Sequence, residues 1–293
     1  MQVKTIRKTI SSKMEDWLSS IKDEKLAKEV KENLLVSGGC IASMFLKEDV
    51  NDYDIYLKDM DVLLKLVKHY VGSRCEVFDG RKKEELIKSI KADYSVEQID
   101  EVNNQRSIAI RSLKEDQIKI NAGGGVRIDY KEGEEAPKYR LLFISPNAIS
   151  LSDDIQIVCR FHGNAEQIHK TFDFIHATNY FTFSDGLVTN VKALESLITK
   201  QLHYQGSLYP LTSIIRSKKF IKRGWNIGAG EYLKIMFQIS ELELKDPEVL
   251  DDQLIGVDVA YFSTLINILR GRKEKTDLNS EYLNELIDKV FSE

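Results

Sequence analysis

An apolar segment that ends in two glycines, followed by two aspartates one residue apart, constrains the fold of this chain more than any other feature. Residues 34–39 read Leu-Leu-Val-Ser-Gly-Gly, and residues 51–57 read Asn-Asp-Tyr-Asp-Ile-Tyr-Leu. Both segments have the apolar and aromatic composition of strands, and the intervening residues 40–47 are predicted to form a short helix. Because side chains alternate along a strand, Asp52 and Asp54 are expected on one face. The sequence therefore predicts a strand, a Gly-Gly turn, a helix and a second strand that carries two neighbouring carboxylates.

This arrangement suits a nucleoside triphosphate and a divalent cation. Two carboxylates side by side stay ionised at low cost only when a cation lies between them. Gly38 and Gly39 add no side-chain bulk, so their backbone, together with Ser37 and the N-terminus of the following helix, could hold phosphate. Glycine pairs alone are common in turns, and acidic pairs alone are common at strand ends. The combination of the two predicts a nucleotide and magnesium site.

Composition limits the other possibilities. The chain has 293 residues, of which 42% are hydrophobic and 30% charged, as is typical of a soluble globular protein with one or two domains. Its formal net charge of −4 gives no support to bulk binding of nucleic acid. No apolar run approaches the roughly 20 residues that cross a bilayer, and residues 1–13 lack the apolar stretch of a secretory signal. We therefore expect no membrane partner. The three scattered cysteines suit free thiols in a reducing compartment, so we expect a cytoplasmic protein.

The order of the expected elements predicts an α+β fold. Strand-like runs alternate with short helical patterns up to about residue 188, and from about residue 190 onward the patterns are helical. We therefore expect a catalytic head with a mixed β-sheet over residues 1–188 and an all-helical neck and body over residues 189–293. The individual expectations include a helix over 10–32 that begins near Ser11 or Ser12, a glycine turn at 123–125, strands over 139–144, 155–161 and 172–183, and helices over 190–203, 210–223, 230–242, 257–270 and 280–291.

The Gly-Gly turn and the acid pair resemble the signature of the DNA polymerase beta-like nucleotidyltransferase superfamily. In that signature an apolar residue and Gly-Gly or Gly-Ser precede Asp-x-Asp or Asp-x-Glu. The resemblance implies a nucleotidyltransferase that transfers a nucleoside monophosphate from an NTP, such as ATP, to an acceptor hydroxyl. It further implies that Asp52 and Asp54 are catalytic ligands of two Mg²⁺ ions, with Mn²⁺ as a substitute. Ser37, Gly38 and Gly39 would then hold the triphosphate.

A third carboxylate usually completes the site in that superfamily, and two residues have the expected local pattern. Asp173 lies between aromatic residues in an apolar segment, where a charge is costly unless it is paired or bound to metal. Asp129 also has apolar neighbours, but Arg127 shares its strand face and is a ready partner. We favour Asp173 as the third catalytic and metal-binding residue and keep Asp129 as the alternative.

A second resemblance covers the segments that follow. Residues 172–179 and 214–225 resemble a strand and the neck helix of CCA-adding tRNA nucleotidyltransferases and bacterial poly(A) polymerases. The charged residues in 200–223 are all basic, and Arg216 and Lys219 share one face of the expected helix. The resemblance implies nucleotide contacts from Arg216 and Lys219 and an RNA acceptor, most simply a tRNA-like 3′ end. An ordinary solvated helix face is the alternative explanation of these basic residues.

Departures from that family leave the acceptor open. The helix after Gly-Gly has no arginine, and the base-reading Glu-Asp-x-x-Arg element is replaced by Tyr209, Pro210 and Ser213. The arginines expected just before the third acid are replaced by Thr171 and Phe172. We therefore expect polymerase-like metal chemistry, whereas these residues give no support to C-then-A selectivity. Besides an RNA 3′ end, the alternatives are transfer to a protein or small molecule, as in toxin-like or antibiotic-modifying relatives, and an inactive fold that serves as a binding module.

Overall fold

The chain forms two compact units. The computed structural model describes residues 2–71, 75–79, 106–114, 117–121, 126–128, 130, 137–145, 147–244, 246–253, 284–285 and 287–288. The first unit comprises Met1–His169 and Ala177–Ala193, and the second comprises Lys170–His176 and Leu194–Glu293. The fold is α+β, as the sequence predicts, and the division into domains at residue 188 stays a prediction.

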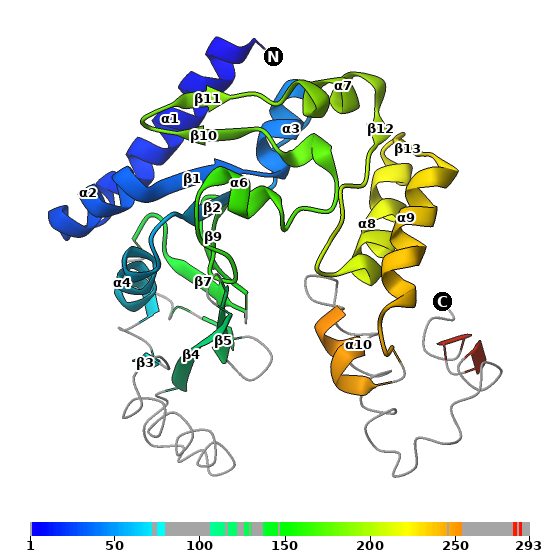
Figure 1. Ribbon diagram of the computed structural model, residues 1–293. Coiled ribbons are helices and arrows are strands. Elements are labelled where there is room, and N and C mark those ends of the chain that lie inside the picture. The colour runs from blue at the N-terminus through cyan, green and yellow to red at the C-terminus, as the bar shows by residue number, and fades with distance from the viewer. Residues whose placement is uncertain are drawn as a thin grey trace. The chain divides into compact units, whose positions relative to one another are not determined.

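The first unit is built on a mixed sheet, which has eight strands in the described residues and the order β11-β10-β1-β2-β9-β8-β7-β6 (Figure 1). Its strands are β1 (Leu34–Ser37), β2 (Tyr53–Leu57), β6 (Val126–Arg127), β7 (Leu141–Ile144), β8 (Ala148–Leu151), β9 (Ile155–Val158), β10 (Tyr180–Thr182) and β11 (Gly186–Val188). β2 and β9 run parallel, and the other neighbours run antiparallel. Every residue of β1 is buried, which explains why this strand reads as a continuous apolar run in the sequence.

Helices pack around this sheet and supply much of the core. They are α1 (Val3–Ser19), α2 (Glu24–Asn33), α3 (Gly39–Leu46), α4 (Met60–Val71) and the short α6 (Ala165–His169). On α1, Ile6, Ile10, Met14 and Trp17 recur at helical spacing and are completely buried. The Trp17 indole N–H donates a hydrogen bond to the Tyr70 hydroxyl at 2.8 Å, which links α1 to α4.

The single helix predicted over residues 10–32 is wrong. α1 begins at Val3 and ends at Ser19, and a second helix, α2, begins at Glu24. The break has a local cause, because Asp23 Oδ1 accepts a hydrogen bond from the Leu26 N–H at 3.0 Å and caps the new helix. The serines near which the helix was expected to start are instead inside α1.

The strand predicted over residues 172–183 is shorter than expected. Ile175–Ala177 forms a 3₁₀ turn, η1, and β10 begins only at Tyr180. β8 and β11 are strands that the sequence analysis does not predict. The glycine turn at 123–125 and the helix at 257–270 lie outside the described residues, as does most of 280–291.

A small sheet and several helices complete the described chain. β3 (Cys75–Asp79), β4 (Arg106–Lys114) and β5 (Gln117–Asn121) form a three-stranded sheet in that order. After α7 (Val191–Thr199), the second unit contains β12 (Gln201–Leu202), α8 (Pro210–Lys222), β13 (Asn226–Ile227), α9 (Ala229–Ser240) and α10 (Pro247–Gln253). Among the helices that the structure describes, none is both long and apolar enough to cross a membrane.

Candidate nucleotide and metal site

The turn after β1 brings a glycine backbone beside an aspartate. Gly38 has a φ of +94° and a ψ of −148°, a conformation that residues with side chains rarely adopt, and it caps the N-terminus of α3. A Cβ atom at Gly38 would lie 3.1 Å from Asp54 Oδ2. Gly39, in contrast, is exposed, and a Cβ atom there would meet no described atom within 4 Å. The turn therefore presents open backbone at Gly39, next to the Asp54 carboxylate.

The register of β2 explains this proximity. β1 and β2 are antiparallel, with Ser37 directly opposite Asp54. Asp54 is half-buried, and Asp52 immediately precedes the strand and is exposed. Tyr53 and Ile55, which alternate with the acids, are buried. The two predicted acids thus lie at the start of β2, at the same edge of the sheet as the glycine turn.

The neighbouring strand β9 adds Gln156 to this edge, and Asp154 immediately precedes that strand. Gln156 pairs with Asp54 in the parallel register, and Gln156 Nε2 donates a hydrogen bond to Asp54 Oδ1 at 3.0 Å. The backbone carbonyl of Asp154 accepts a hydrogen bond from the Tyr53 N–H at 2.7 Å. Partial desolvation, and then the negative charge of Asp154, raise the pKa of Asp52. The negative charges of Asp52, Asp54 and Asp154 would together favour a bound cation.

Below the turn, Ser37 is completely buried and its hydroxyl is engaged. Ser37 Oγ lies 2.8 Å from the Asn179 carbonyl oxygen, 3.3 Å from the Ala177 carbonyl oxygen and 2.9 Å from His169 Nε2. When the Ser37 hydroxyl donates to the Asn179 carbonyl, which can only accept, His169 must be the tautomer whose Nε2–H donates to Ser37. Burial lowers the pKa of His169 to about 4, so the ring is neutral at pH 7.

The first turn of α3 holds the N–H groups that could receive an anion. The Gly38 N–H is already used, since it donates to the Ala177 carbonyl at 3.2 Å. The next N–H groups, beginning with Gly39, stand at a helix N-terminus, where no preceding turn accepts from them and where the helix dipole attracts negative charge. Ser37 and Gly38 therefore stabilise the conformation of the turn, and Gly39 is its exposed residue.

The donor set would fit a hard divalent cation that arrives with a triphosphate. The described residues contain no group of three His, Cys, Asp or Glu side chains that could hold a metal ion. Mg²⁺ is, however, commonly held by one or two carboxylates together with the phosphates of its substrate. Asp52 and Asp54 could supply those two carboxylates. The pKa of Asp52 is raised mainly by desolvation and then by the negative charge of Asp154, and a cation would offset that charge.

Asp173 belongs to the second unit, where it already has a cationic partner. It lies just before η1 and not on a strand of the sheet, so the predicted strand position is wrong. The side chain is buried, and its Oδ2 accepts a hydrogen bond from Arg216 Nη1 at 3.1 Å. Its Oδ1 accepts from the Phe174 N–H at 3.0 Å. The cost of burying this charge, which suggested a metal ligand, is therefore offset by Arg216.

The predicted basic helix exists as α8, and its buried positions are mostly small polar residues. Lys219 is exposed, as are Lys218, Lys222 and Arg223. The buried positions are Pro210, Thr212, Ser213 and Ser217. Asp129, the alternative third carboxylate, lies outside the described residues.

Gln156 and His169 are the residues that sequence reasoning missed. Gln156 alternates with buried residues in a predicted strand, so a pairing of that strand with β2 would have placed it beside the acids. His169 ends a short helix far from Ser37 in the sequence, and only the tertiary fold brings the two together. A histidine without metal-ligand spacing carries no local signal of such a contact.

The fold and the site define an α+β protein in which a glycine turn and an acid pair share one sheet edge. Residues 8–200 match the family described as "Gabija anti-defense 2 family protein". This chain belongs to the Gabija anti-defense 2 family.

A relative and two solved structures extend this comparison. The chain is 25% identical over 133 residues to "Gabija anti-defense 2" of Bacillus phage SPbetaL7, a match that covers 45% of this chain and about a third (32%) of the relative's length. The structure is similar to a Thermotoga maritima CCA-adding enzyme complexed with tRNA, with a TM-score of 0.43, 12% identity, and coverage of 82% of this chain and 46% of that chain. It is also similar to a tRNA-processing enzyme with CTP, with a TM-score of 0.39, 12% identity, and coverage of 84% and 55%.

Proposed function

We propose that this protein is a magnesium-dependent nucleotidyltransferase that acts against a Gabija defence. The observation that carries the proposal is the position of the Asp54 carboxylate directly beside Gly38 at the N-terminus of α3. This position brings the acid pair, which can hold a cation, next to the backbone of the turn, which can hold phosphate. The family to which the chain belongs supports the anti-defence role.

In the proposed reaction, the chain's own groups bind and orient the nucleotide. The backbone at Gly39 and the following N–H groups of α3 would receive phosphate oxygens. Gln156 would fix the Asp54 carboxylate through its hydrogen bond to Oδ1. Asp52 and Asp54 would hold Mg²⁺, which when bound neutralises the triphosphate and lowers the pKa of the acceptor hydroxyl. His169 and Ser37 would hold the turn in the conformation that leaves Gly39 open.

The acceptor that we favour is a protein component of the defence. A family named for countering Gabija needs a target in that system, and covalent nucleotidylation of a protein is a direct way to change its activity. Nucleotidyl transfer joins the α-phosphorus to an acceptor oxygen, breaks the bond to the β-phosphate bridge and releases pyrophosphate. The acceptor hydroxyl loses its proton in the same exchange.

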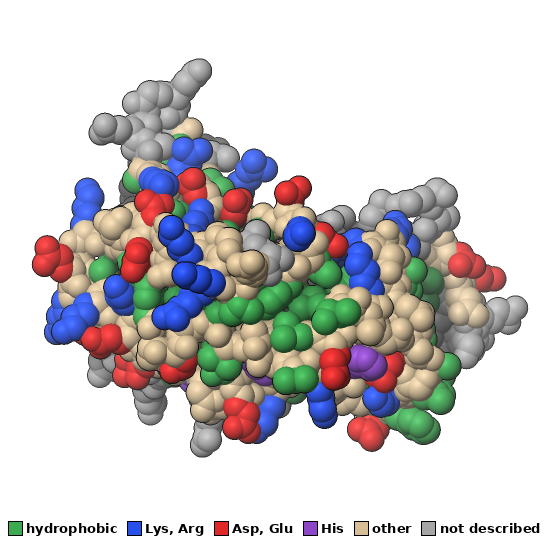
Figure 2. Space-filling model, turned by 90° about the horizontal axis from the view of Figure 1, so that it is seen from above, with side chains coloured by type: hydrophobic (Ala, Val, Ile, Leu, Met, Phe, Trp, Pro, Cys, Tyr) green, Lys and Arg blue, Asp and Glu red, His purple; other side chains and the backbone are tan. Residues whose placement is uncertain are grey.

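An RNA 3′ end is the second candidate acceptor, and the exposed basic residues of α8 favour it. Lys218, Lys219, Lys222 and Arg223 could contact phosphates. On the face of the molecule shown in Figure 2, Lys and Arg side chains are interspersed with Asp and Glu side chains.

A labelling experiment separates these acceptors. The protein, Mg²⁺ and each NTP labelled at the α-phosphate would be incubated with extracts of bacteria that carry a Gabija defence, and the label would be followed in protein and in RNA. We expect label in protein that disappears with Asp54→Asn and with EDTA. Label in RNA alone would select the second acceptor. Labelling that is absent from both pools, or unchanged in Asp54→Asn, would refute the proposed function.

A further inference from the structure

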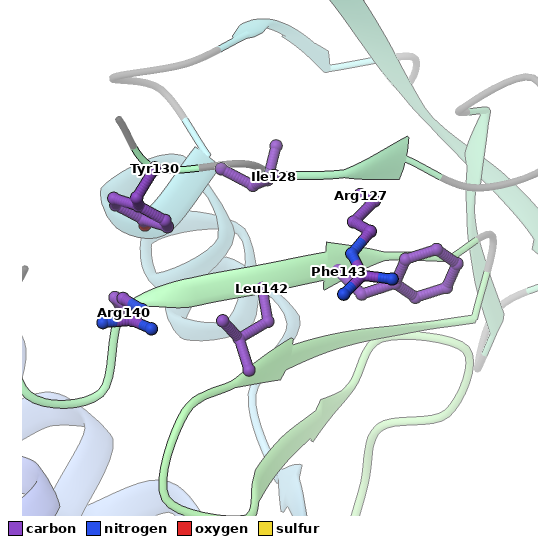
Figure 3. Close-up of a pocket in the computed structure, with 6 residues that line it drawn as sticks. All are labelled: Arg127, Ile128, Tyr130, Arg140, Leu142 and Phe143. Atoms are coloured by element: carbon purple, nitrogen blue, oxygen red, sulfur yellow. The ribbon is translucent and has the colours of Figure 1, made fainter. Parts of the chain in front are cut away.

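The first unit has a second feature with the properties of a ligand site, at the far edge of the sheet. A cavity of about 520 Å³ adjoins β6 and β7 and is lined by Arg127, Ile128, Tyr130, Arg140, Leu142 and Phe143 (Figure 3). Sites for small ligands typically have volumes of about 300–1,000 Å³. β9 and β8 lie between β2 and β7, so about 14 Å of sheet, at about 4.8 Å per strand, separates β7 from the strand of Asp54. The cavity is therefore distinct from the glycine turn.

Among the residues that the structure describes, the lining carries positive charge from Arg127 and Arg140 and no acidic side chain. Arg140 lies with its guanidinium carbon 5.2 Å from the centre of the Tyr130 ring. Arg140 Nε is buried, and among the described residues it has no hydrogen-bond partner. A buried donor without an acceptor is costly, and an anion in the cavity would supply the acceptor. Guanidinium groups bind phosphate with two parallel hydrogen bonds, so phosphate is the anion that best matches this group.

The cavity also offers aromatic surface next to its cations. Arg127 on β6 pairs with Phe143 on β7 in the antiparallel register, and Figure 3 shows them beside each other, with Tyr130 and Arg140 at the other end of the cavity. The pairing of β7 with β8 shifts between Leu141 and Phe143, an irregularity that turns consecutive side chains toward the surface. As a result Phe143 is 39% exposed although it lies within a strand.

We propose that this cavity binds a nucleotide. Its phosphate would lie on Arg140 and its base would stack on Phe143, at the other end of the cavity, since nucleobases stack on aromatic rings. Ile128 and Leu142 provide apolar surface between the two ends. A free nucleotide and a nucleotide unit of a single strand share this chemistry. The inference does not depend on the proposed transferase activity, because it uses none of the residues around Gly38 and Asp54.

The test measures binding under conditions in which a metal-bound triphosphate cannot form. Calorimetric titration with AMP, and fluorescence anisotropy with a labelled six-nucleotide single strand of RNA or DNA, would be carried out in EDTA. We expect binding of at least one of these probes, and about tenfold weaker binding for Arg140→Gln because a charge-assisted hydrogen bond is lost. Phe143→Ser, at an exposed position, should weaken binding through lost stacking. AMP binding would identify a free nucleotide as the ligand, and binding of the oligonucleotide alone would identify a single strand.

Two controls make the result specific to the cavity. Lys25→Gln removes an exposed positive charge from α2 and should leave binding unchanged. Thermal unfolding of each variant would show that Phe143→Ser remains folded even if Arg140→Gln does not. The proposal is overturned if no probe binds the wild-type protein at millimolar concentration. It is also overturned if folded Phe143→Ser binds as tightly as the wild type, or if Lys25→Gln weakens binding equally.

Discussion

Gly38 and Asp54 are packed so closely that a methyl group on Gly38 would lie 3.1 Å from the carboxylate oxygen Oδ2. This proximity joins the end of β1, the N-terminus of α3 and the start of β2 into one small surface. Glycine is therefore required at position 38 for two reasons: its backbone conformation and the limited space beside the Asp54 carboxylate.

Replacement of Gly38 by alanine should therefore destabilise the protein and displace Asp54. We expect a loss of about 1–3 kcal/mol in the free energy of unfolding, because the φ of +94° is strained for alanine. Gly39→Ala is the matched control, since its Cβ atom would be in open space and alanine favours helices. Urea unfolding measures both variants, and equal stability of the two would contradict the account of the turn.

Gln156 provides a test of charge balance at the site. Gln156→Glu would place another carboxylate beside Asp54. In EDTA, the free energy of unfolding of this variant should be lower than that of the wild type by about 1 kcal/mol or more. Addition of Mg²⁺ should stabilise the variant more than it stabilises the wild type. Thermal unfolding with and without Mg²⁺ measures the difference. Gln156→Ala removes the donor without adding charge and should gain no extra stabilisation from Mg²⁺. The same response to Mg²⁺ in all three proteins would argue against a cation site at Asp54.

His169 should make stability dependent on pH. Its folded-state pKa is about 4, below the ordinary value of 6.5, so the unfolded chain takes up a proton first as the pH falls. Stability should be complete above pH 6.5 and should decline by up to about 3 kcal/mol toward pH 4. His169→Gln keeps an N–H donor for Ser37 but does not titrate, and should reduce this decline. His203→Gln, at an exposed histidine, is the control, and an unchanged decline in His169→Gln would disprove the assignment.

The Asp173–Arg216 pair should be structural in the second unit. Arg216→Gln leaves a buried carboxylate without its cation and should cost about 1–3 kcal/mol of unfolding free energy. The double variant Asp173→Asn with Arg216→Gln should recover part of that loss. In transferase assays, Asp173→Asn should leave the Mg²⁺ concentration for half-maximal activity unchanged. A large increase in that concentration would instead support the sequence-based prediction that Asp173 binds metal.

The local part of the candidate site was predictable from the sequence because it depends on short-range geometry. The apolar run, the glycine pair and the spacing of Asp52 and Asp54 place a turn, a helix and a strand in order, and the structure has these elements. The hydrogen bonds from Gln156 and His169 were not predictable, since they depend on how β9 and α6 pack against β1 and β2.

The errors in the predicted fold also have physical causes. A short polar segment was interpreted as helix, although Asp23 caps a new helix there. On α8, Thr212, Ser213 and Ser217 form the buried face, which hydrophobic periodicity cannot detect. Their hydroxyl groups bond to backbone carbonyls, as Ser213 does to Tyr209 and Ser217 does to Ile214, and this lets small polar residues be buried.

The most direct test of the central proposal compares ATP labelled at the α-phosphate with ATP labelled at the γ-phosphate, in the presence of Mg²⁺ and extract of bacteria that carry a Gabija defence. The account predicts that the α-label becomes covalently attached to an acceptor, that the γ-label is released as pyrophosphate, and that Asp54→Asn abolishes the attachment. Attachment of the γ-label, or attachment of the α-label that survives in Asp54→Asn, would contradict nucleotidyl transfer at this site.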